Sequence, residues 1–203
     1  MASFDLVETM AFDPSEGILN LDRHLARMKA SAGQFGFRFD RHGARNDLQA
    51  ATFRFREPRR LRLLLSPSGT MAIESRRAPP TPSEPVAVAL APLPLAADDV
   101  RLHHKTSDRA FYDEARLAAG TFEVLFVDGD GFLTQGSFTN IFVERDGILL
   151  TPPLSRAVLP GVLRSQLIDE GYAKEGELRA EDLAAGFSIG NSLRGLINAR
   201  LVG

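Results

Sequence analysis

The sequence contains no cysteine and no tryptophan, and only three of its 24 basic residues are lysines. The lack of cysteine excludes disulfide bonds, thiolate nucleophiles and thiolate metal sites. No apolar run is long enough to span a bilayer, because the most apolar segment, Val86–Leu95, is interrupted by Pro92 and Pro94. The first residues, MASFDLVETM, lack a basic segment followed by a long apolar one. We therefore expect no signal peptide and a cytoplasmic location.

The 203 residues are enough for one large domain or two small ones, and 44% of them are hydrophobic, as is usual for a globular protein with a core. The net charge of −2 gives no electrostatic reason to expect nucleic acid or an anionic membrane as a partner. Arginine supplies nearly all of the positive charge. The three lysines, Lys29, Lys105 and Lys174, therefore each raise the question of a special role.

A proline-rich segment, Ala78–Pro85, predicts a linker between two domains, residues 1–80 and 81–203, because it can be neither helix nor central strand. Periodicity in the first domain predicts two helices, the first with Asp22 as its N-cap, and two strand pairs. The second domain is predicted to be mostly β with two helices. The predicted strands are 4–10, 18–21, 61–65, 70–74, 86–90, 122–127, 137–143, 148–150, 187–191 and 196–201, and the predicted helices are 22–35, 46–55, 108–119 and 161–170. The fold class is α+β.

A polar hexamer, Gln135–Asn140, lies between two apolar segments in GFLTQGSFTNIFV. Five of its six positions are polar or glycine, although a buried strand normally carries apolar side chains. The hexamer is either a solvated sheet edge or a surface that faces a polar group other than water.

Lys105 lies in RLHHKTSDR, where a predicted strand meets a helix. If the strand continues to Lys105, the side chains of His103 and Lys105 point the same way and that of His104 points the other way. A partly desolvated lysine among imidazoles and an arginine has a lowered pKa, which a Schiff-base lysine needs. The alternative is a surface lysine at a helix start. The histidine pair has no third ligand nearby in sequence, so we expect no metal site.

Three further features have two interpretations each. The helix that begins near Gly161 leaves the N–H groups of Val162 and Leu163 available to a phosphate, although many helices begin in this way. Arg27 falls on the polar side of its predicted helix, which favours a solvated charge. Ser192, in GNSLRG, either helps to cap a turn or offers its hydroxyl to a phosphate.

Taken in order, five motifs resemble those of the fold-type IV pyridoxal-phosphate enzymes, the class IV aminotransferase family. The motifs are LDRHLARM, HKTSDRAFYDEAR, GFLTQGSFTNIFV, LLTPPLSRAVLPGVLR and IGNSLRGLI. The family includes branched-chain and D-amino-acid aminotransferases and aminodeoxychorismate lyase. The resemblance implies a D-amino-acid aminotransferase-like fold, with a small α/β domain, a larger β-rich pseudo-barrel domain and the cofactor in the cleft between them. It also implies a homodimer.

The resemblance implies that the cofactor is pyridoxal 5′-phosphate (PLP), and that Lys105 forms the Schiff base with it and moves protons. The residues implied to hold the PLP phosphate are Arg27, Val162, Leu163 and Ser192, and this role replaces the solvated interpretation of Arg27. Gln135 matches the position that faces the pyridine nitrogen, with Ser137 and Thr139 on the same face of the predicted strand. Arg109 and Thr139 are candidate substrate contacts, and the alternative for Arg109 is a helix-surface charge.

Several motifs resemble the lyase more than the branched-chain aminotransferases. The implied reaction releases pyruvate from 4-amino-4-deoxychorismate and leaves 4-aminobenzoate for folate synthesis. Gln135 departs from the family, which almost always has glutamate there. Glutamine cannot neutralise a pyridinium, and a buried charge without its partner costs roughly 3–5 kcal/mol, so we expect an unprotonated ring nitrogen. An aromatic product makes the lyase reaction more tolerant of this weaker electron sink.

Two alternatives to the lyase remain. One is an aminotransferase that acts on a small branched-chain or D-amino acid. The other is a family member that binds PLP with little or no catalysis, which the glutamine and a small domain that is shorter than usual at its start both favour. We expect a small-molecule amino substrate in either enzyme.

Overall fold

The computed structural model describes residues 4–202, which form two compact units. Unit 1 comprises the described residues up to Pro80 together with His104–Asp108, and unit 2 comprises Thr81–His103 and the residues from Arg109 onward. The proline-rich segment 78–85 contains no helix or strand. Within residues 4–202, none of the helices is long and apolar enough to cross a membrane.

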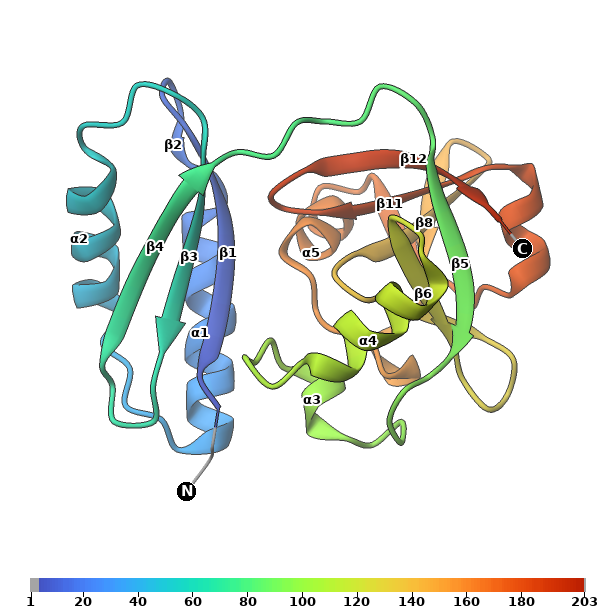
Figure 1. The fold of residues 1–203 in the computed structure, drawn as a ribbon, viewed down its shortest axis with the longest axis horizontal. Helices are drawn as coiled ribbons and strands as arrows, with labels where there is room; N and C mark the ends of the chain where they lie inside the picture. Colours follow the sequence, from blue (N-terminus) through green and yellow to red (C-terminus); the bar gives the residue numbers. More distant parts are fainter. Residues whose placement is uncertain (1–3, 203) are drawn as a thin grey trace. The chain divides into compact units, whose positions relative to one another are not determined.

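Unit 1 is a four-stranded antiparallel sheet with two helices (Figure 1). Its elements are β1 (Leu6–Asp13), β2 (Gly17–Ile18), α1 (Leu21–Phe35), α2 (Arg41–Thr52), β3 (Arg59–Leu65) and β4 (Met71–Arg77), in the sheet order β2-β1-β3-β4. Leu61, Leu63 and Leu65 alternate along β3 and are fully buried, because successive side chains of a strand face opposite sides. They pack in one core with Leu25 and Met28 of α1.

The start of each helix in unit 1 differs from the prediction. Asn20, and not Asp22, is the N-cap of α1, so the capping role predicted for Asp22 is wrong. The Asp22 carboxylate lies in the first turn and instead accepts hydrogen bonds from Arg41 and Arg45. Helix α2 begins earlier than predicted because Asp40 accepts hydrogen bonds from two backbone N–H groups of its first turn, at 3.0 Å each.

The segment His104–Asp108 joins the edge of the unit 1 sheet. The backbone N–H of Val7 donates to the carbonyl of Lys105 at 2.9 Å, and Leu6 and Thr106 form an antiparallel bridge. Lys105 is therefore fixed against β1 by its own backbone, even though almost a hundred residues of chain separate the two.

Unit 2 is built on an eight-stranded sheet with the order β10-β9-β8-β11-β12-β5-β6-β7. Its strands are β5 (Val86–Pro92), β6 (Glu123–Val127), β7 (Leu133–Gly136), β8 (Asn140–Arg145), β9 (Ile148–Thr151), β10 (Ala173–Glu175), β11 (Phe187–Asn191) and β12 (Gly195–Leu201), and its helices are α3 (Val100–His103), α4 (Ala110–Ala119) and α5 (Val162–Asp169), with short 3-10 turns at Leu154–Arg156 and Ala180–Ala185. Helix α3 occupies the residues just before Lys105, so no strand continues to Lys105 and the condition under which His103 and Lys105 would point the same way is not met. The large sheet and the small sheet of unit 1 confirm the α+β class.

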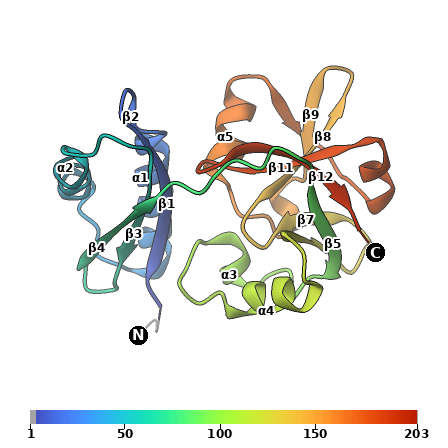
Figure 2. The ribbon, with the colours of Figure 1, turned by 45° about the horizontal axis from the view of Figure 1, so that its top comes forward.

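The polar hexamer forms the corner between β7 and β8 (Figure 2). The two strands follow each other in the chain but are far apart in the strand order, which indicates a sheet that curls as the predicted pseudo-barrel requires. The single strand predicted over 137–143, with Gln135, Ser137 and Thr139 on one face, is wrong. Strand β7 ends at Gly136, whose N–H donates to the carbonyl of Thr139 at 2.8 Å and closes a tight turn.

Candidate active site

Unit 1 contains a buried cluster of three charged or titratable side chains. Glu8 of β1 accepts hydrogen bonds from both Nε and Nη2 of Arg27, at 2.8 and 2.6 Å. The Nδ1 atom of His24 lies 2.6 Å from the same carboxylate. Glu8 and His24 are no more than 1% exposed, and the Arg27 side chain is 12% exposed. Arg27 is therefore held in one orientation and is not the solvated charge that periodicity favoured.

The electrostatics of this cluster are dominated by burial and by the arginine. Burial alone would raise the pKa of Glu8, but the charges of Arg27 and His24 outweigh it and hold that pKa at about 2. Burial lowers the pKa of His24, and the positive charges of Arg27 and Lys105 lower it further, although Glu8 opposes them. The charge of Lys105 thus affects the pKa of His24 on α1. The sequence did not suggest His24 as a neighbour of this lysine.

Lys105 is half-buried next to a fixed histidine. The Nδ1 atom of His104 lies 2.8 Å from the hydroxyl of Ser31, and its ring makes an edge contact with Phe35 at 4.8 Å. These contacts hold the chain on the N-terminal side of Lys105, and the bond from Val7 holds its carbonyl. The backbone of Lys105 is thus held by contacts on both sides within unit 1.

In unit 2, the side chain of Gln135 joins three segments. Its Nε2 donates to the carbonyl of Ala157 and to the hydroxyl of Tyr112, both at 2.9 Å, and lies 3.2 Å from the carbonyl of Leu102. Its Oε1 accepts from the N–H of Leu159 at 3.0 Å. These partners fix which end of the amide is oxygen. The sequence suggested neither Tyr112 nor the loop around Ala157 as partners.

Glu123 at the start of β6 organises the turn that follows Gln135. Its carboxylate accepts hydrogen bonds from the hydroxyls of Ser137 and Thr139 and from the N–H groups of Val124, Ser137 and Phe138. Burial raises the pKa of this fully buried acid, while the five donors favour its charged form. Thr139, predicted to contact substrate, thus directs its hydroxyl to Glu123.

Helix α5 begins with a close approach to the same turn. Gly161 is its N-cap, and because glycine has no side chain, this residue cannot cap the first N–H groups of the helix. A Cβ at Gly161 would lie 1.8 Å from Oδ1 of Asn140, and Nδ2 of Asn140 donates to the carbonyl of Leu159 at 3.2 Å. The glycine is therefore required for the loop to enter α5 at this angle, which directs the N–H groups of the predicted residues Val162 and Leu163 out of the helix end.

Strand β11, which leads into the turn that carries Ser192, packs against this helix start. A Cβ at Gly190 would lie 2.9 Å from Cδ2 of Leu163, which shows how closely β11 approaches α5. Asn191 caps the turn by accepting from the N–H groups of Leu193 and Arg194, and it donates to the carbonyl of Phe138 at 3.1 Å. The predicted ligands Val162 and Leu163 thus lie on a helix that packs against the strand leading into Ser192.

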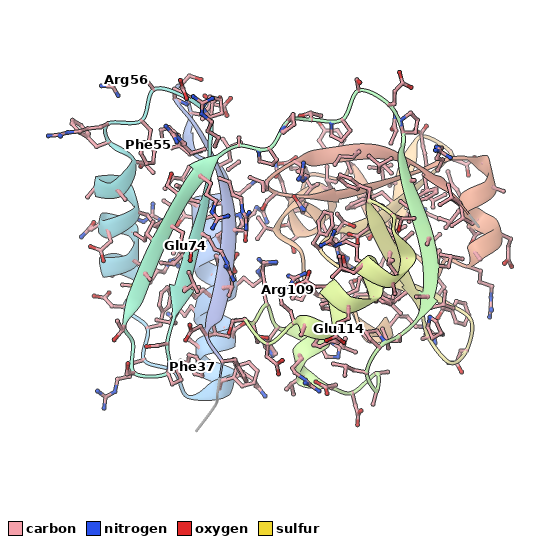
Figure 3. All side chains as sticks on the ribbon, in the orientation of Figure 1. Phe37, Phe55, Arg56, Glu74, Arg109 and Glu114 are labelled. Carbon is pink, nitrogen blue, oxygen red and sulfur yellow. The ribbon has the colours of Figure 1, made fainter. Side chains whose placement is uncertain are left out.

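Arg109, labelled in Figure 3, is the N-cap residue of α4 and contacts the same turn through a hydrogen bond. Its Nη2 donates to the carbonyl of Ser137 at 2.7 Å, and its guanidinium lies 5.6 Å from the ring centre of Tyr112. The side chain is 25% exposed and hydrogen-bonded to the turn, so Arg109 is not a free helix-surface charge, and its contact with substrate stays a prediction. Among residues 4–202, no group of three or more metal-ligating side chains is present.

Comparison with known proteins gives a match over almost the whole chain. The family described as "Amino-transferase class IV" matches residues 5–202. No curated protein sequence was matched.

Solved structures show the same fold. A candidate amino-acid aminotransferase from Mesorhizobium loti is 38% identical, with a TM-score of 0.91 over 98% of this chain and 100% of that one. A candidate 4-amino-4-deoxychorismate lyase is 26% identical, with a TM-score of 0.80 over 97% of this chain and 84% of that one. The PLP-bound form of a hypothetical aminotransferase from Mycobacterium tuberculosis is 22% identical, with a TM-score of 0.85 over 98% of this chain and 81% of that one.

Proposed function

Because the chain belongs to the class IV aminotransferase family, whose members are PLP-dependent enzymes, we propose that it is a PLP-dependent lyase of the 4-amino-4-deoxychorismate type. The reaction converts 4-amino-4-deoxychorismate to 4-aminobenzoate and pyruvate. The family resemblance also leads us to propose a homodimer in the cytoplasm.

The residues present fit PLP. Gly161, the N-cap of α5, has no side chain to cap the first N–H groups of the helix, and β11, which leads into Ser192, packs against Leu163 at Gly190; both observations support a phosphate at this helix start. The proposal assigns the phosphate to Val162, Leu163 and Ser192, together with Arg27, whose orientation Glu8 fixes. Lys105 is the residue that would bind the PLP aldehyde and move the proton at the substrate carbon that bears the amino group.

The observation that favours the lyase is the neutral, fully hydrogen-bonded side chain of Gln135. PLP, when bound, supplies an electron sink whose strength depends on the protonation of its ring nitrogen. An uncharged neighbour does not stabilise a protonated ring nitrogen. The lyase reaction gains an aromatic product, so it depends less on a strong sink than transamination does. The buried carboxylate of Glu123, which bonds the turn after Gln135, already accepts five hydrogen bonds and so does not take the place of the missing glutamate at 135.

The second candidate is an aminotransferase on a small branched-chain or D-amino acid. The 38% identity to the candidate amino-acid aminotransferase from Mesorhizobium loti favours it. A PLP-binding protein with little or no catalysis is the third candidate, and the same glutamine is consistent with it.

The test begins with the absorbance of the purified chain after addition of PLP. We expect a yellow band that is lost in Lys105→Ala and kept in Lys174→Ala, a matched control because Lys174 is exposed on β10. Absence of the band from the wild type would contradict all three candidates.

Pyruvate release from 4-amino-4-deoxychorismate, measured with a coupled dehydrogenase, then separates the candidates. Release by the wild type and not by Lys105→Ala supports the lyase. Conversion of the band by an amino acid, without pyruvate release, supports the aminotransferase, and a stable band with neither reaction supports the third candidate.

A further inference from the structure

The hydrogen-bonding capacity of Gln135 is used almost completely by its protein partners. A glutamine amide has two N–H donors, and three acceptors lie within reach of them: the carbonyls of Ala157 and Leu102 and the hydroxyl of Tyr112. A ring nitrogen would be a fourth acceptor for two donors. Gln135 therefore has no N–H to offer a ligand unless it gives up a buried backbone carbonyl, which is unfavourable.

Tyr112 has the opposite balance. Its hydroxyl accepts from Gln135 at 2.9 Å, and a hydroxyl in that role still has its own proton to donate. Within residues 4–202, the structure records no acceptor for this proton, although the residue is only 7% exposed. A buried donor without an acceptor is rare in folded proteins and indicates a missing partner.

The position of Tyr112 is fixed independently of this hydroxyl. Its ring packs against Phe111 and Phe126, with ring centres 4.4 and 5.4 Å apart, and under the guanidinium of Arg109. Arg109 in turn holds the start of α4 to the carbonyl of Ser137 at 2.7 Å. The hydroxyl is thus presented beside Gln135 by packing, and removing it leaves that packing in place.

We propose that the hydroxyl of Tyr112 donates the hydrogen bond to the pyridine nitrogen of PLP, and that Gln135 is a positioning residue that orients this hydroxyl and the 157–159 loop. The inference rests on the proposed PLP binding. It replaces the direct contact between Gln135 and the ring that the family resemblance implied. The ligand class is an unprotonated heteroaromatic nitrogen, because a neutral phenol can donate to it but cannot stabilise its protonated form.

The chemistry of the phenol agrees with this role. Burial raises the pKa of Tyr112, so its proton is retained throughout the physiological pH range. A hydrogen bond between a neutral phenol and a neutral ring nitrogen leaves no unpaired charge in the site. The enzyme thus keeps the ring nitrogen hydrogen-bonded while avoiding the charged pair that a glutamate would form.

The test compares PLP with 1-deaza-PLP, in which a C–H group replaces the ring nitrogen. Tyr112→Phe removes only the hydroxyl, and Tyr172→Phe is a matched control because Tyr172 is the only other tyrosine and is 63% exposed. We expect Tyr112→Phe to weaken PLP binding by about three- to tenfold, the range of one neutral hydrogen bond, and to leave the binding of 1-deaza-PLP unchanged. Equal weakening for both ligands, or no weakening for either, would overturn the proposal.

A second measurement covers the case in which Tyr112→Phe folds poorly. Tyr172→Phe protein labelled with carbon-13 at the tyrosine Cζ gives one NMR signal, which belongs to Tyr112. This signal is expected to move when PLP binds and to move much less with 1-deaza-PLP, and the same shift with both ligands would overturn the proposal. A wild type without the Lys105-dependent band would instead show that the proposed function itself has failed.

Discussion

Replacing Gln135 by glutamate, the residue usual in the family, is expected to destabilise unit 2. The carboxylate keeps the bond from the N–H of Leu159 but has no N–H for the carbonyls of Ala157 and Leu102. The amide has two N–H groups, so the change removes two hydrogen bonds of about 0.5–1.5 kcal/mol each and leaves buried acceptors unsatisfied, which together amount to about 2–4 kcal/mol. For a chain of this size, that lowers the melting midpoint by roughly 5–15 °C.

The loss should also depend on pH, because the new carboxyl is 97% buried if it replaces a side chain that is 3% exposed. Burial raises its pKa above the unfolded value of about 4.3, so the folded state favours the protonated acid. The protonated form can donate one bond to Ala157. Stability is therefore kept below the unfolded pKa and lost as the pH rises through the folded pKa.

Thermal melts of Gln135→Glu and wild type at about pH 5 and about pH 8 measure both effects, since these values lie on either side of a raised carboxyl pKa. Gln49→Glu makes the same chemical change at an exposed position of α2 and controls for the added charge. An unchanged midpoint for Gln135→Glu at both pH values, or a larger loss at the lower pH, would refute the reasoning.

Two further predictions concern the predicted phosphate ligands. Glu8→Gln leaves Arg27 without its buried counter-charge, so it should lower the free energy of unfolding by about 3 kcal/mol at neutral pH. The pKa of Glu8 is depressed to about 2, so the wild type loses this stability as the pH falls from 4.5 towards 2. Over that range its denaturation midpoints should approach those of the variant. Gly161→Ala places a Cβ 1.8 Å from Oδ1 of Asn140, so it should lower the free energy of unfolding by about 1–3 kcal/mol and weaken PLP binding. Thermal melting and absorbance titration measure the two effects. Gly129→Ala, whose Cβ would have no atom within 4 Å, is the control and should show neither effect.

The elements that the sequence predicted well are those whose burial follows a single period. Helix α1 ends where expected, and strand β11 has its expected extent, because one side of each is apolar and a glycine or a turn ends it. Strand β7 was not predicted, since all four of its residues are buried, two of them polar, and no alternation is visible. Helix α2 began earlier than expected because its first turn is polar and is stabilised by Asp40 alone.

The site was predicted less completely for a different reason. The motifs gave Lys105, Arg27 and Gln135, but the side chains that orient them were not predicted. Glu8 lies 19 residues from Arg27 in sequence, and Tyr112 lies 23 residues from Gln135. Two buried acids carried a weak signal: Glu8 lies at an inward position of β1, and Glu123 lies beside the apolar residues of β6. Only the fold shows which donors those acids meet.

The polar hexamer is neither a solvated sheet edge nor a surface that faces only a ligand. Its side chains bond other parts of the protein. Its polar side chains secure three segments. Gln135 bonds the 157–159 loop and Tyr112. Ser137 and Thr139 both bond the buried acid Glu123 of β6, and Asn140 bonds the entry to α5. Because the curled sheet brings these segments to one corner, an apolar turn there would leave a carboxylate and several backbone groups without partners. The corner is therefore polar because its side chains hold these segments together, and the carbonyls of Ala157 and Leu102 favour an N–H donor at position 135.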